Sequence, residues 1–298
     1  MRHATCIAFL KWALPRLGLA WPGFRRVHRQ VCKRISRRLG ELHLPDALAY
    51  RQFLEAHPDE WPVLDSFCWI SISRFYRDRA VFDHLVKEIL PDLAANALAE
   101  GWNELKCCSL GCAAGEEPYS LNLLWKFQLA ARFPALVLSV IAVDADEGAL
   151  QRARGGCFRG GSLKELPAER LNSAFNRSRD QHRVKPEFRA GVEFRLQNIR
   201  ENIPRGPFDL ILCRNLVFTY FDAPSQCKLL RQILTELRPA GVLVIGRKES
   251  LPADEIDIEP CPAGLGIYRK LRGKRLSAIA PTRSRGHKAH NQDRARFG

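Results

Sequence analysis

The sequence lacks the patterns of several common sites and segments. No two of its ten cysteines stand at Cys-x-x-Cys spacing, and no Cys and His cluster has zinc-ligand spacing, so we expect no metal site. The cysteines are scattered, several within apolar runs, which is typical of buried free thiols in a reducing compartment. The apolar N-terminal run 7–19 is broken by Lys11, Pro15 and Arg16 and has no small-residue cleavage site. We therefore expect a cytoplasmic protein without a membrane span.

Acidic residues are scarce at both ends of the chain. Residues 1–40 hold ten Lys and Arg and no acid, and residues 270–298 hold nine and one acid. The whole chain carries +15, so residues 41–269 carry −3. A protein built to bind nucleic acid would carry positive charge on its folded body as well, so we do not expect that partner. Residues 271–298 have no apolar period and predict a basic disordered tail.

A glycine turn between an apolar run and an amphipathic run is the most informative segment. It has Gly111 and Gly115, but neither the G-x-G-x-x-G pattern of dinucleotide enzymes nor the Lys-Ser or Lys-Thr of a P-loop. The helix that follows begins with Glu116 and Glu117, and carboxylates at a helix N-terminus repel phosphate and tolerate a cation. S-adenosylmethionine has a sulfonium cation and no phosphate. The loop therefore predicts a site for this methyl donor.

Further apolar runs predict the rest of an α/β domain. Runs that suit buried strands lie at residues 105–110, 136–143, 208–213 and 241–246, with helical patterns at 119–132 and at 223–238, which Pro239 ends. Strands that alternate with helices imply a mostly parallel sheet covered on both faces. Ligands bind such sheets at the carboxyl ends of the strands, where Asp144 and Arg214-Asn215 stand.

The N-terminal third predicts a small helical domain at 23–100, after an irregular arm at 1–22. Apolar residues recur at helical spacing from Gly23 to Leu42. Shorter helices are expected at 45–56, 60–67 and 78–90, and the stretch from Pro91 to Gly101 is expected to link the two domains. The opposite face of the first helix carries Arg25, Arg26, Arg29, Lys33, Arg34, Arg37 and Arg38. This face is either a solvated surface or a docking surface for an acidic partner.

The catalytic domain is expected to span 101–270 and to include a small inserted subdomain at 157–192. A short helix is expected from Leu166 to Leu171, and 182–189 could form a small hairpin. The fold class is therefore α/β, with a helical domain followed by a Rossmann-like domain that has a mostly parallel sheet and a small antiparallel insertion.

The motifs together resemble the CheR-type methyltransferases, which esterify glutamate side chains of bacterial chemoreceptors. The resemblance is carried by Ile72-Ser-Arg-Phe-Tyr-Arg-Asp78, Gly111-Cys-Ala-Ala-Gly-Glu-Glu-Pro-Tyr-Ser120, Ser162-Leu-Lys-Glu-Leu-Pro167, Val192-Glu-Phe194, Cys213-Arg-Asn215 and Tyr220-Phe-Asp222. It covers roughly residues 25 to 270 and implies a class I methyltransferase domain that binds S-adenosylmethionine. The chain resembles a divergent branch that is not obviously tied to chemotaxis.

The resemblance also implies roles for individual residues. The implied cofactor-binding residues are Ser71, Ser73, Arg77, Gly111, Gly115, Glu117, Asp144, Asn198, Ile199, Arg214 and Asn215, and the implied catalytic residues are Arg77 and Tyr220. Glu117 would contact the amino group of the donor or lie near the sulfonium. Asp144 would bind the ribose hydroxyls, and Asn198-Ile199 would frame the adenine. Arg77 could hold a carboxylate of the donor or of the acceptor.

Each of these residues also has a structural interpretation. Glu117 could interact only with the helix dipole, Asp144 could cap the next helix, and Asn198 could be a turn residue. Packing alone would explain poorly why a buried strand is followed by the polar pair Arg214-Asn215.

The chain also departs from the family pattern in three places. Ser71 and Ser73 stand where the family has Asn and Thr, and the run 216–220 is one residue longer than usual, which leaves the register of Tyr220 open. The segment 175–192 is a few residues short, which puts the tethering of a receptor peptide in doubt.

A carboxylate acceptor would explain why the motifs contain no catalytic His or Cys. A glutamate with a pKa of about 4.3 is already ionised at neutral pH, so alignment of the reacting atoms would suffice. In the family a basic N-terminal helix faces the substrate, which implies a helical or receptor-like acidic acceptor facing Arg25–Arg38. The rivals are a methyltransferase for nucleic acid or small molecules and a non-catalytic regulatory protein that binds the donor. We expect a monomer.

Overall fold

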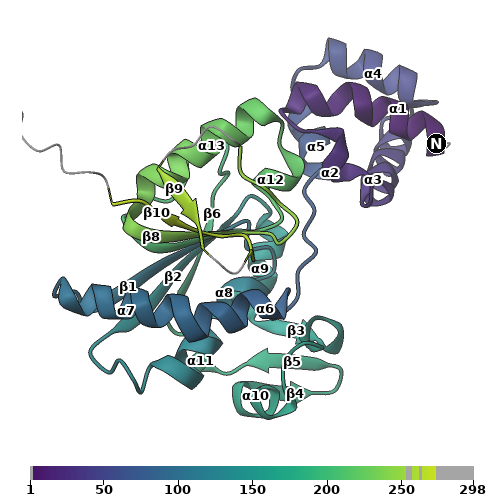
Figure 1. Ribbon diagram of the computed structural model, residues 1–298. Coiled ribbons are helices and arrows are strands. Elements are labelled where there is room, and N and C mark those ends of the chain that lie inside the picture. Colours follow the sequence, from purple (N-terminus) through teal and green to yellow (C-terminus); the bar gives the residue numbers. More distant parts are fainter. Residues whose placement is uncertain (1–2, 253–256, 262–263, 273–298) are drawn as a thin grey trace, which may run out of the picture.

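The computed structural model describes residues 3–252, 257–261 and 264–272 of the 298-residue chain. A cluster of helices at the N-terminus stands beside a larger α/β body (Figure 1). These N-terminal elements are α1 (His3–Ala13), η1 (Leu14–Leu17), α2 (Trp21–Phe24), α3 (His28–Glu41), α4 (Ala47–Ala56) and α5 (Glu60–Phe67). None of the described helices is long and apolar enough to cross a membrane.

A seven-stranded sheet forms the centre of the body, in the order β6-β2-β1-β7-β8-β10-β9. Its strands are β1 (Glu104–Leu110), β2 (Val137–Asp144), β6 (Val192–Leu196), β7 (Phe208–Cys213), β8 (Leu237–Ile245), β9 (Ile258–Pro260) and β10 (Ile267–Lys270). The first five are parallel, and β10 pairs antiparallel with both β8 and β9. The predicted α/β class with a mostly parallel sheet is confirmed.

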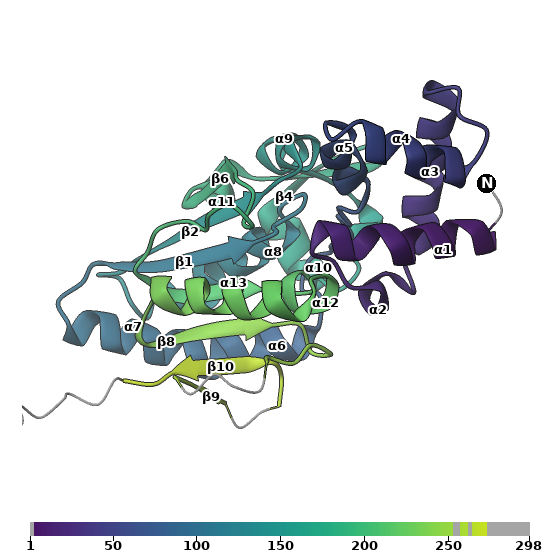
Figure 2. The same ribbon diagram turned by 90° about the horizontal axis from the view of Figure 1, so that it is seen from above.

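Helices cover both faces of the sheet (Figure 2). One face packs against α6 (Arg79–His84), the π-helical turn η2 (Leu85–Ile89), α7 (Leu90–Ala99), α8 (Glu116–Leu124) and the π-helical turn η3 (Trp125–Leu129). The other face packs against α13 (Ala223–Glu236) and joins a core that continues into the N-terminal helices. The remaining helices are α9 (Glu147–Gly155), η4 (Gly160–Leu163), α10 (Ala168–Ala174), α11 (Pro186–Arg189) and α12 (Val217–Tyr220).

The insertion after α9 contains a small antiparallel sheet in the order β3-β5-β4, as predicted. Its strands are β3 (Cys157–Arg159), β4 (Phe175–Ser178) and β5 (Gln181–Val184). The hairpin predicted at 182–189 was placed too late in the chain, because the turn falls at Arg179 and Asp180 and residues 186–189 form α11. Arg179 adopts a left-handed backbone conformation with φ of 49°, which allows the chain to reverse there.

The irregular arm predicted for residues 1–22 is wrong. Cys6, Phe9, Leu10 and Ala13 recur at helical spacing, and α1 buries all four of them in the core. Pro15 does not interrupt α1, since it lies in the following turn η1, where a proline near the start is tolerated.

Two further differences from the prediction concern segments that pack on or enter the sheet. The stretch from Pro91 to Gly101 is no linker: α7 runs through it and buries Leu93, Ala94 and Ala97 with the sheet. The predicted helix 223–238 ends at Glu236, because Leu237 already pairs with Phe208 as the first residue of β8. An apolar residue at the boundary between a helix and a strand is compatible with either element. Pairing with a neighbouring strand therefore determines which of the two it joins. The predicted tail lies outside the described residues except for 271 and 272.

Cys6 and Cys32 form a disulfide, contrary to the expectation that all cysteines are free. The packing of α1 on α3 brings their Cα atoms to 6.0 Å, a spacing that the sequence could not reveal while α1 went unrecognised. The other eight cysteines are free thiols, and five of them are buried.

Candidate functional site

A cleft opens where the carboxyl ends of the parallel strands meet the segment that leaves the N-terminal helices. It encloses about 1010 Å³, part of it open to solvent. The predicted residues that line it are Ser71, Ser73, Arg77, Gly111, Glu117, Asp144, Asn198, Ile199, Arg214, Asn215 and Tyr220. Gly115 is the predicted site residue that is absent from the lining. The structure therefore brings together residues that are dispersed along most of the chain.

The glycine loop between β1 and α8 can take its shape only with small residues. Gly111 has φ of 72°, and a Cβ there would lie 2.5 Å from the side chain of Leu216. Gly115 has φ of 92°, and a Cβ there would press on Ala153 and Phe194 at 3.1 Å. Gly111 therefore shapes the cleft, whereas Gly115 sets the close packing behind the loop.

Glu117 is a largely buried carboxylate on the first turn of α8, with 12% of its side chain exposed. It accepts hydrogen bonds from the Ser109 hydroxyl at 2.9 Å and from Arg214 Nη1 at 3.1 Å. Burial raises the pKa of Glu117, and the neighbouring Arg214 guanidinium opposes that rise. Its side chain does more than meet the helix dipole, since it lines the cleft and joins a network that crosses from α8 to β7.

Arg214 connects the end of β7 to the segment before α6. Its Nη2 donates to the carbonyl oxygen of Arg77 at 2.7 Å and to Asp78 Oδ2 at 2.8 Å. Its guanidinium also lies over the ring of Phe82. The sequence placed Arg214 at the ligand edge of the sheet. The structure adds that most of its contacts hold the Arg77–Asp78 turn in place, where Asp78 has a left-handed φ of 60°.

Asp144 holds the glycine loop from the end of β2. It accepts from the backbone nitrogen of Ala113 at 2.8 Å and from that of Asp146 at 2.9 Å, and burial raises its pKa. The cap of the next helix is a different residue: Asp146 accepts from Ala149 at the start of α9. The alternative interpretation of Asp144 as that cap is therefore wrong, and its carboxylate remains at the cleft.

Asn198 behaves as a turn residue in this structure. Its side-chain oxygen accepts from the backbone nitrogen of Arg200 at 3.1 Å, and its side-chain nitrogen donates to Glu201 at 3.1 Å. Ile199 beside it is buried and offers an apolar surface to the cleft. The role of this pair in framing an adenine stays a prediction.

The segment that carries Ser71, Ser73 and Arg77 forms the outer wall. Arg77 Nη1 donates to the carbonyl oxygen of Ile72 at 3.0 Å, and no described acid pairs with Arg77. Two other arginines of the wall already form salt bridges, Arg74 with Glu165 and Arg200 with Asp65. Arg77 is thus the described cleft arginine that is best placed to receive a carboxylate.

The loop from Asn215 to Phe221, with Tyr220 in the cleft wall, is held by an acid that the sequence analysis missed. Glu249 accepts from the backbone nitrogens of Asn215 at 2.9 Å and Gly246 at 2.5 Å, and from the hydroxyl of Thr219. The only signal was an acid three residues beyond the glycine that follows β8. Asn215 has φ of 56°, and its side-chain oxygen is buried without a partner in the described structure.

The lining fits a cationic nucleoside donor. Two acids with raised pKa values, Glu117 and Asp144, lie in the cleft, and Arg77 stands at its wall. The unpartnered oxygen of Asn215 is an acceptor that a bound amine or hydroxyl group would satisfy. Buried acids of this kind favour ammonium, sulfonium and hydroxyl groups over phosphate.

The basic face of α3 is smaller than the sequence suggested. Arg38 binds Glu60 through two hydrogen bonds of 2.9 and 2.8 Å and also contacts Glu41. Arg34 donates to the carbonyl oxygens of Phe67 and Trp69 at 2.8 Å. Two of the seven basic side chains of this face, those of Arg34 and Arg38, are therefore engaged by other residues of the N-terminal region. Exposed basic residues remain at Arg29, Lys33 and Arg37 of α3 and at Arg25 and Arg26 in the turn before it, since α3 begins at His28 and not at Gly23 as predicted.

Comparison with known proteins agrees with this geometry. Residues 71–265 match the CheR methyltransferase, SAM binding domain. The chain is 31% identical over 244 residues to an uncharacterized 104.1 kDa protein of Rhodobacter capsulatus, covering 81% of this chain and 25% of that relative's length. It is 31% identical to a chemotaxis protein methyltransferase of Listeria innocua, covering 70% of this chain and 78% of the relative. It is 34% identical to a chemotaxis protein methyltransferase of Salmonella typhimurium, covering 74% of this chain and 75% of the relative.

The family match spans the glycine loop, both buried acids and the segment that carries Arg77. The chain therefore belongs to the CheR methyltransferase family and is a methyltransferase that uses S-adenosylmethionine.

Proposed function

We propose that the protein transfers the methyl group to a carboxylate of a protein acceptor, forming an ester on glutamate or a similar acid. The observation that carries the proposal is that the carboxylates described in the cleft lining are already engaged: Glu117 accepts from Ser109 and Arg214, and Asp144 accepts from Ala113 and Asp146. No histidine lies there, burial raises the pKa of the Cys68 thiol to about 12, and burial raises the pKa of Tyr220. An acceptor that arrives already ionised, as a carboxylate does at neutral pH, suits this lining.

The residues would act mainly by binding and orienting. S-adenosylmethionine, when bound, supplies a methyl group on a sulfonium leaving group. Glu117 and Asp144 would hold the donor. Gly111 has no side chain, so the loop can lie against Leu216 and leave room for the donor. Arg77 would orient a carboxylate through its free donors, and Tyr220 would line the acceptor side. Proximity and orientation can supply about 7–11 kcal/mol of the barrier.

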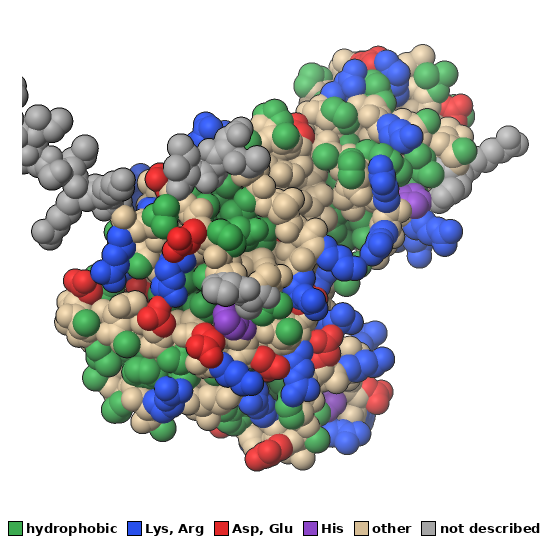
Figure 3. Space-filling view, viewed as in Figure 1, with side chains coloured by type: hydrophobic (Ala, Val, Ile, Leu, Met, Phe, Trp, Pro, Cys, Tyr) green, Lys and Arg blue, Asp and Glu red, His purple; other side chains and the backbone are tan. Residues whose placement is uncertain are grey.

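The charge around the cleft supports an acidic acceptor. Lys and Arg side chains gather around the notch between the N-terminal helices and the small antiparallel sheet (Figure 3). α3 lies on the helical side of this notch (Figure 1), and its exposed Arg29, Lys33 and Arg37 would attract an acidic helix and speed its encounter. The proposal includes a chemotaxis protein as that acceptor, as the names of the chemotaxis relatives suggest. It also includes a cytoplasmic location and a monomeric state.

The test is transfer of labelled methyl from S-adenosylmethionine to protein in a bacterial cell extract. Esters hydrolyse in mild alkali, whereas N-methyl and C-methyl groups do not, so the labelled protein should release volatile methanol after alkaline treatment. Label that survives alkali, or that follows RNA after protease digestion, would exclude a carboxylate acceptor. Calorimetric binding of the donor without any transfer would favour the regulatory alternative.

A charge-reversal series tests the direction of approach. Changing Arg25, Arg29 and Lys33 to Glu should slow transfer and leave donor affinity nearly unchanged, because surface charge mainly tunes encounter. Arg34 and Arg38 are unsuitable for this purpose since both make structural contacts. Reversal of the exposed Lys126, Arg205 and Lys228 is the matched control, since none of them lies on α3 or in the cleft wall.

A further inference from the structure

The segment from Gly18 to Phe24 is joined to the loop that carries Tyr220. The backbone nitrogen of Ala20 donates to the carbonyl oxygen of Tyr220 at 2.8 Å, and that of Asp222 donates to the carbonyl oxygen of Gly18 at 3.0 Å. Between these bonds Leu19 and Phe221 form an antiparallel bridge. A part of the chain that precedes the basic helix therefore pairs, backbone to backbone, with the acceptor side of the cleft.

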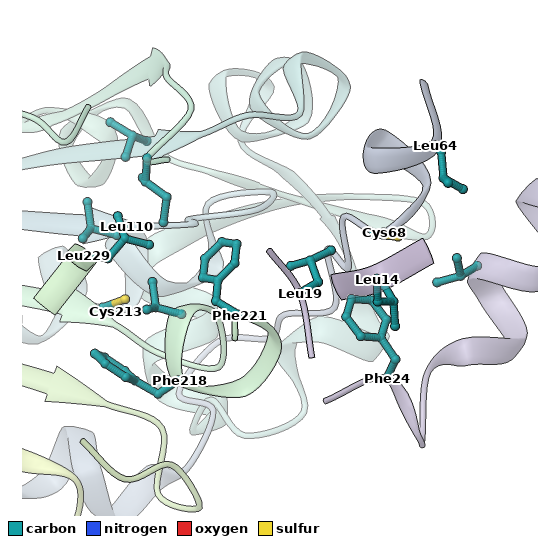
Figure 4. Packing of buried hydrophobic residues seen from close by; sticks show 14 of the residues in the cluster. Leu14, Leu19, Phe24, Leu64, Cys68, Leu110, Cys213, Phe218, Phe221 and Leu229 are labelled. Carbon is teal, nitrogen blue, oxygen red and sulfur yellow. The ribbon is translucent and has the colours of Figure 1, made fainter. Parts of the chain in front are cut away.

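Side chains reinforce this connection on both sides. The rings of Phe24 and Tyr220 lie 5.0 Å apart, and Phe24 is fully buried. Leu19 and Phe221 lie between Leu14 and Phe24 on one side and the sheet core on the other (Figure 4). Leu19 also lines the cleft, so this segment forms part of the cleft wall itself.

At Gly23 the N-terminal segment lies directly against the backbone of the loop that carries Tyr220. A Cβ at this position would lie 2.1 Å from the carbonyl oxygen of Thr219 and 3.1 Å from the Cα of Tyr220. The obstructing atoms are backbone, so no side-chain rotation can relieve the contact. Any side chain at position 23 must push the loop 216–221 away from α2.

We propose that Gly23 is a positioning residue for methyl transfer, which sets the place of Tyr220 by letting α2 lie directly on the loop. The proposal rests on the proposed function, because the acceptor role of Tyr220 is part of it. The loop is also fixed by Glu249, which binds Asn215, Gly246 and Thr219. Tyr220 is thus held by two elements far apart in the chain, while none of the contacts described for Gly23 involves Glu117 or Asp144. The expected signature is a defect in transfer without a defect in donor binding.

The experiment compares Gly23→Ala with Gly40→Ala, since a Cβ at Gly40 would meet nothing within 4 Å. Gly23→Ala should lower the maximal rate of methyl transfer to the extract acceptor about 10- to 100-fold, because a misplacement of about 1 Å can cost that much. Its KM for the donor and its calorimetric Kd for S-adenosylhomocysteine should stay within about twofold of the wild type. Gly40→Ala should match the wild type in every measurement.

A second pair covers the case in which Gly23→Ala fails to fold. Phe24→Leu removes the ring that meets Tyr220, whereas Phe9→Leu removes a buried ring of the same helical unit that packs on Tyr50. Phe24→Leu should lose transfer rate well beyond any loss seen in Phe9→Leu. Equal rates in both pairs, or a fall of donor affinity in proportion to rate, would overturn the proposal.

Amide hydrogen exchange tests the role of Gly23 independently of the identity of the methyl acceptor. If the wild type gives no alkali-labile label, the carboxylate proposal fails, and the positioning claim is then decided by the amides of Ala20 and Asp222. These amides should exchange at least about tenfold faster in Gly23→Ala than in Gly40→Ala, because the bonds to Tyr220 and Gly18 would be strained. Unchanged exchange would refute the role of Gly23 even in that case.

Discussion

Replacing Glu117 with Gln is the sharpest test of the donor site. The change keeps the shape of the side chain and removes its charge, while Arg214 retains its contact with Asp78 at 2.8 Å. A hydrogen bond to a charged group contributes about 1.5–3 kcal/mol, so the Kd for S-adenosylmethionine should rise about 10- to 150-fold. Calorimetry with S-adenosylmethionine and S-adenosylhomocysteine would then show which group of the donor Glu117 meets. Equal losses for both ligands indicate the amino group, and a loss confined to the methylated donor indicates the sulfonium.

The same variant should change the pH dependence of binding. Burial raises the pKa of Glu117 above its usual 4.5, so acidification should neutralise this carboxylate, and weaken donor binding, at a higher pH than for an exposed glutamate. Glu117→Gln should remove that part of the pH dependence. The sign for stability is opposite: with a folded pKa above the unfolded pKa, the contribution of Glu117 is present at low pH and is lost as pH rises through the folded pKa.

Glu116→Gln is the matched control. Glu116 is the adjacent acid on α8, it is buried, and burial also raises its pKa, but it does not line the cleft. Its replacement should leave the affinity for both ligands within about twofold. If Glu117→Gln, shown to be folded by its melting transition, binds both ligands like the wild type, Glu117 does not belong to the donor site.

Three further predictions concern other supports of the cleft. Asp144→Asn should weaken S-adenosylhomocysteine binding at least about tenfold by calorimetry, because an amide cannot accept from both Ala113 and Asp146 and also meet a ribose hydroxyl as a carboxylate does; an unchanged Kd would remove Asp144 from the site. Glu249→Gln should lower the transfer rate more than donor affinity, since it weakens the hold on Asn215 and Thr219; parallel losses would contradict this. Cys6→Ser should lower the free energy of unfolding by about 3.5 kcal/mol in denaturant titrations, the loop-closure estimate for the 26-residue separation of Cys6 and Cys32, and leave donor affinity unchanged; equal stability of oxidised and reduced wild type would refute it.

Elements with a strong local pattern could be predicted from the sequence. The apolar runs that became β1, β2 and β7 lie within one or two residues of their predicted bounds, and α5 begins and ends where expected. The glycine loop was recognisable because Gly111 and Gly115 have backbone conformations that other residues rarely adopt. α1 carried an equally local signal in Cys6, Phe9, Leu10 and Ala13, and it was missed because Lys11 and Pro15 were given more weight than that spacing.

Contacts between distant segments could not be predicted in this way. Arg214 was placed correctly at the end of β7, but its partners Asp78 and Glu117 come from a turn and a helix far earlier in the chain. The basic face of α3 looked uncompensated because Glu60, which binds Arg38, belongs to α5. In both cases the charge was visible in the sequence and the charge that neutralises it was not assignable without the fold.

The donor half and the acceptor half of the cleft differ in how far their contacts could be predicted from the sequence. This difference has a functional consequence. The donor half is built mostly from local features: Gly111 and Glu117 lie on one turn and helix, and Asp144 binds that same turn. The proposed acceptor half depends on Gly23 and Glu249, which meet the loop around Tyr220 from distant parts of the chain. Changes at those two distant positions can therefore alter where the acceptor oxygen is held without disturbing the donor. A family with one methyl donor and differing acceptors would be expected to vary in the second half.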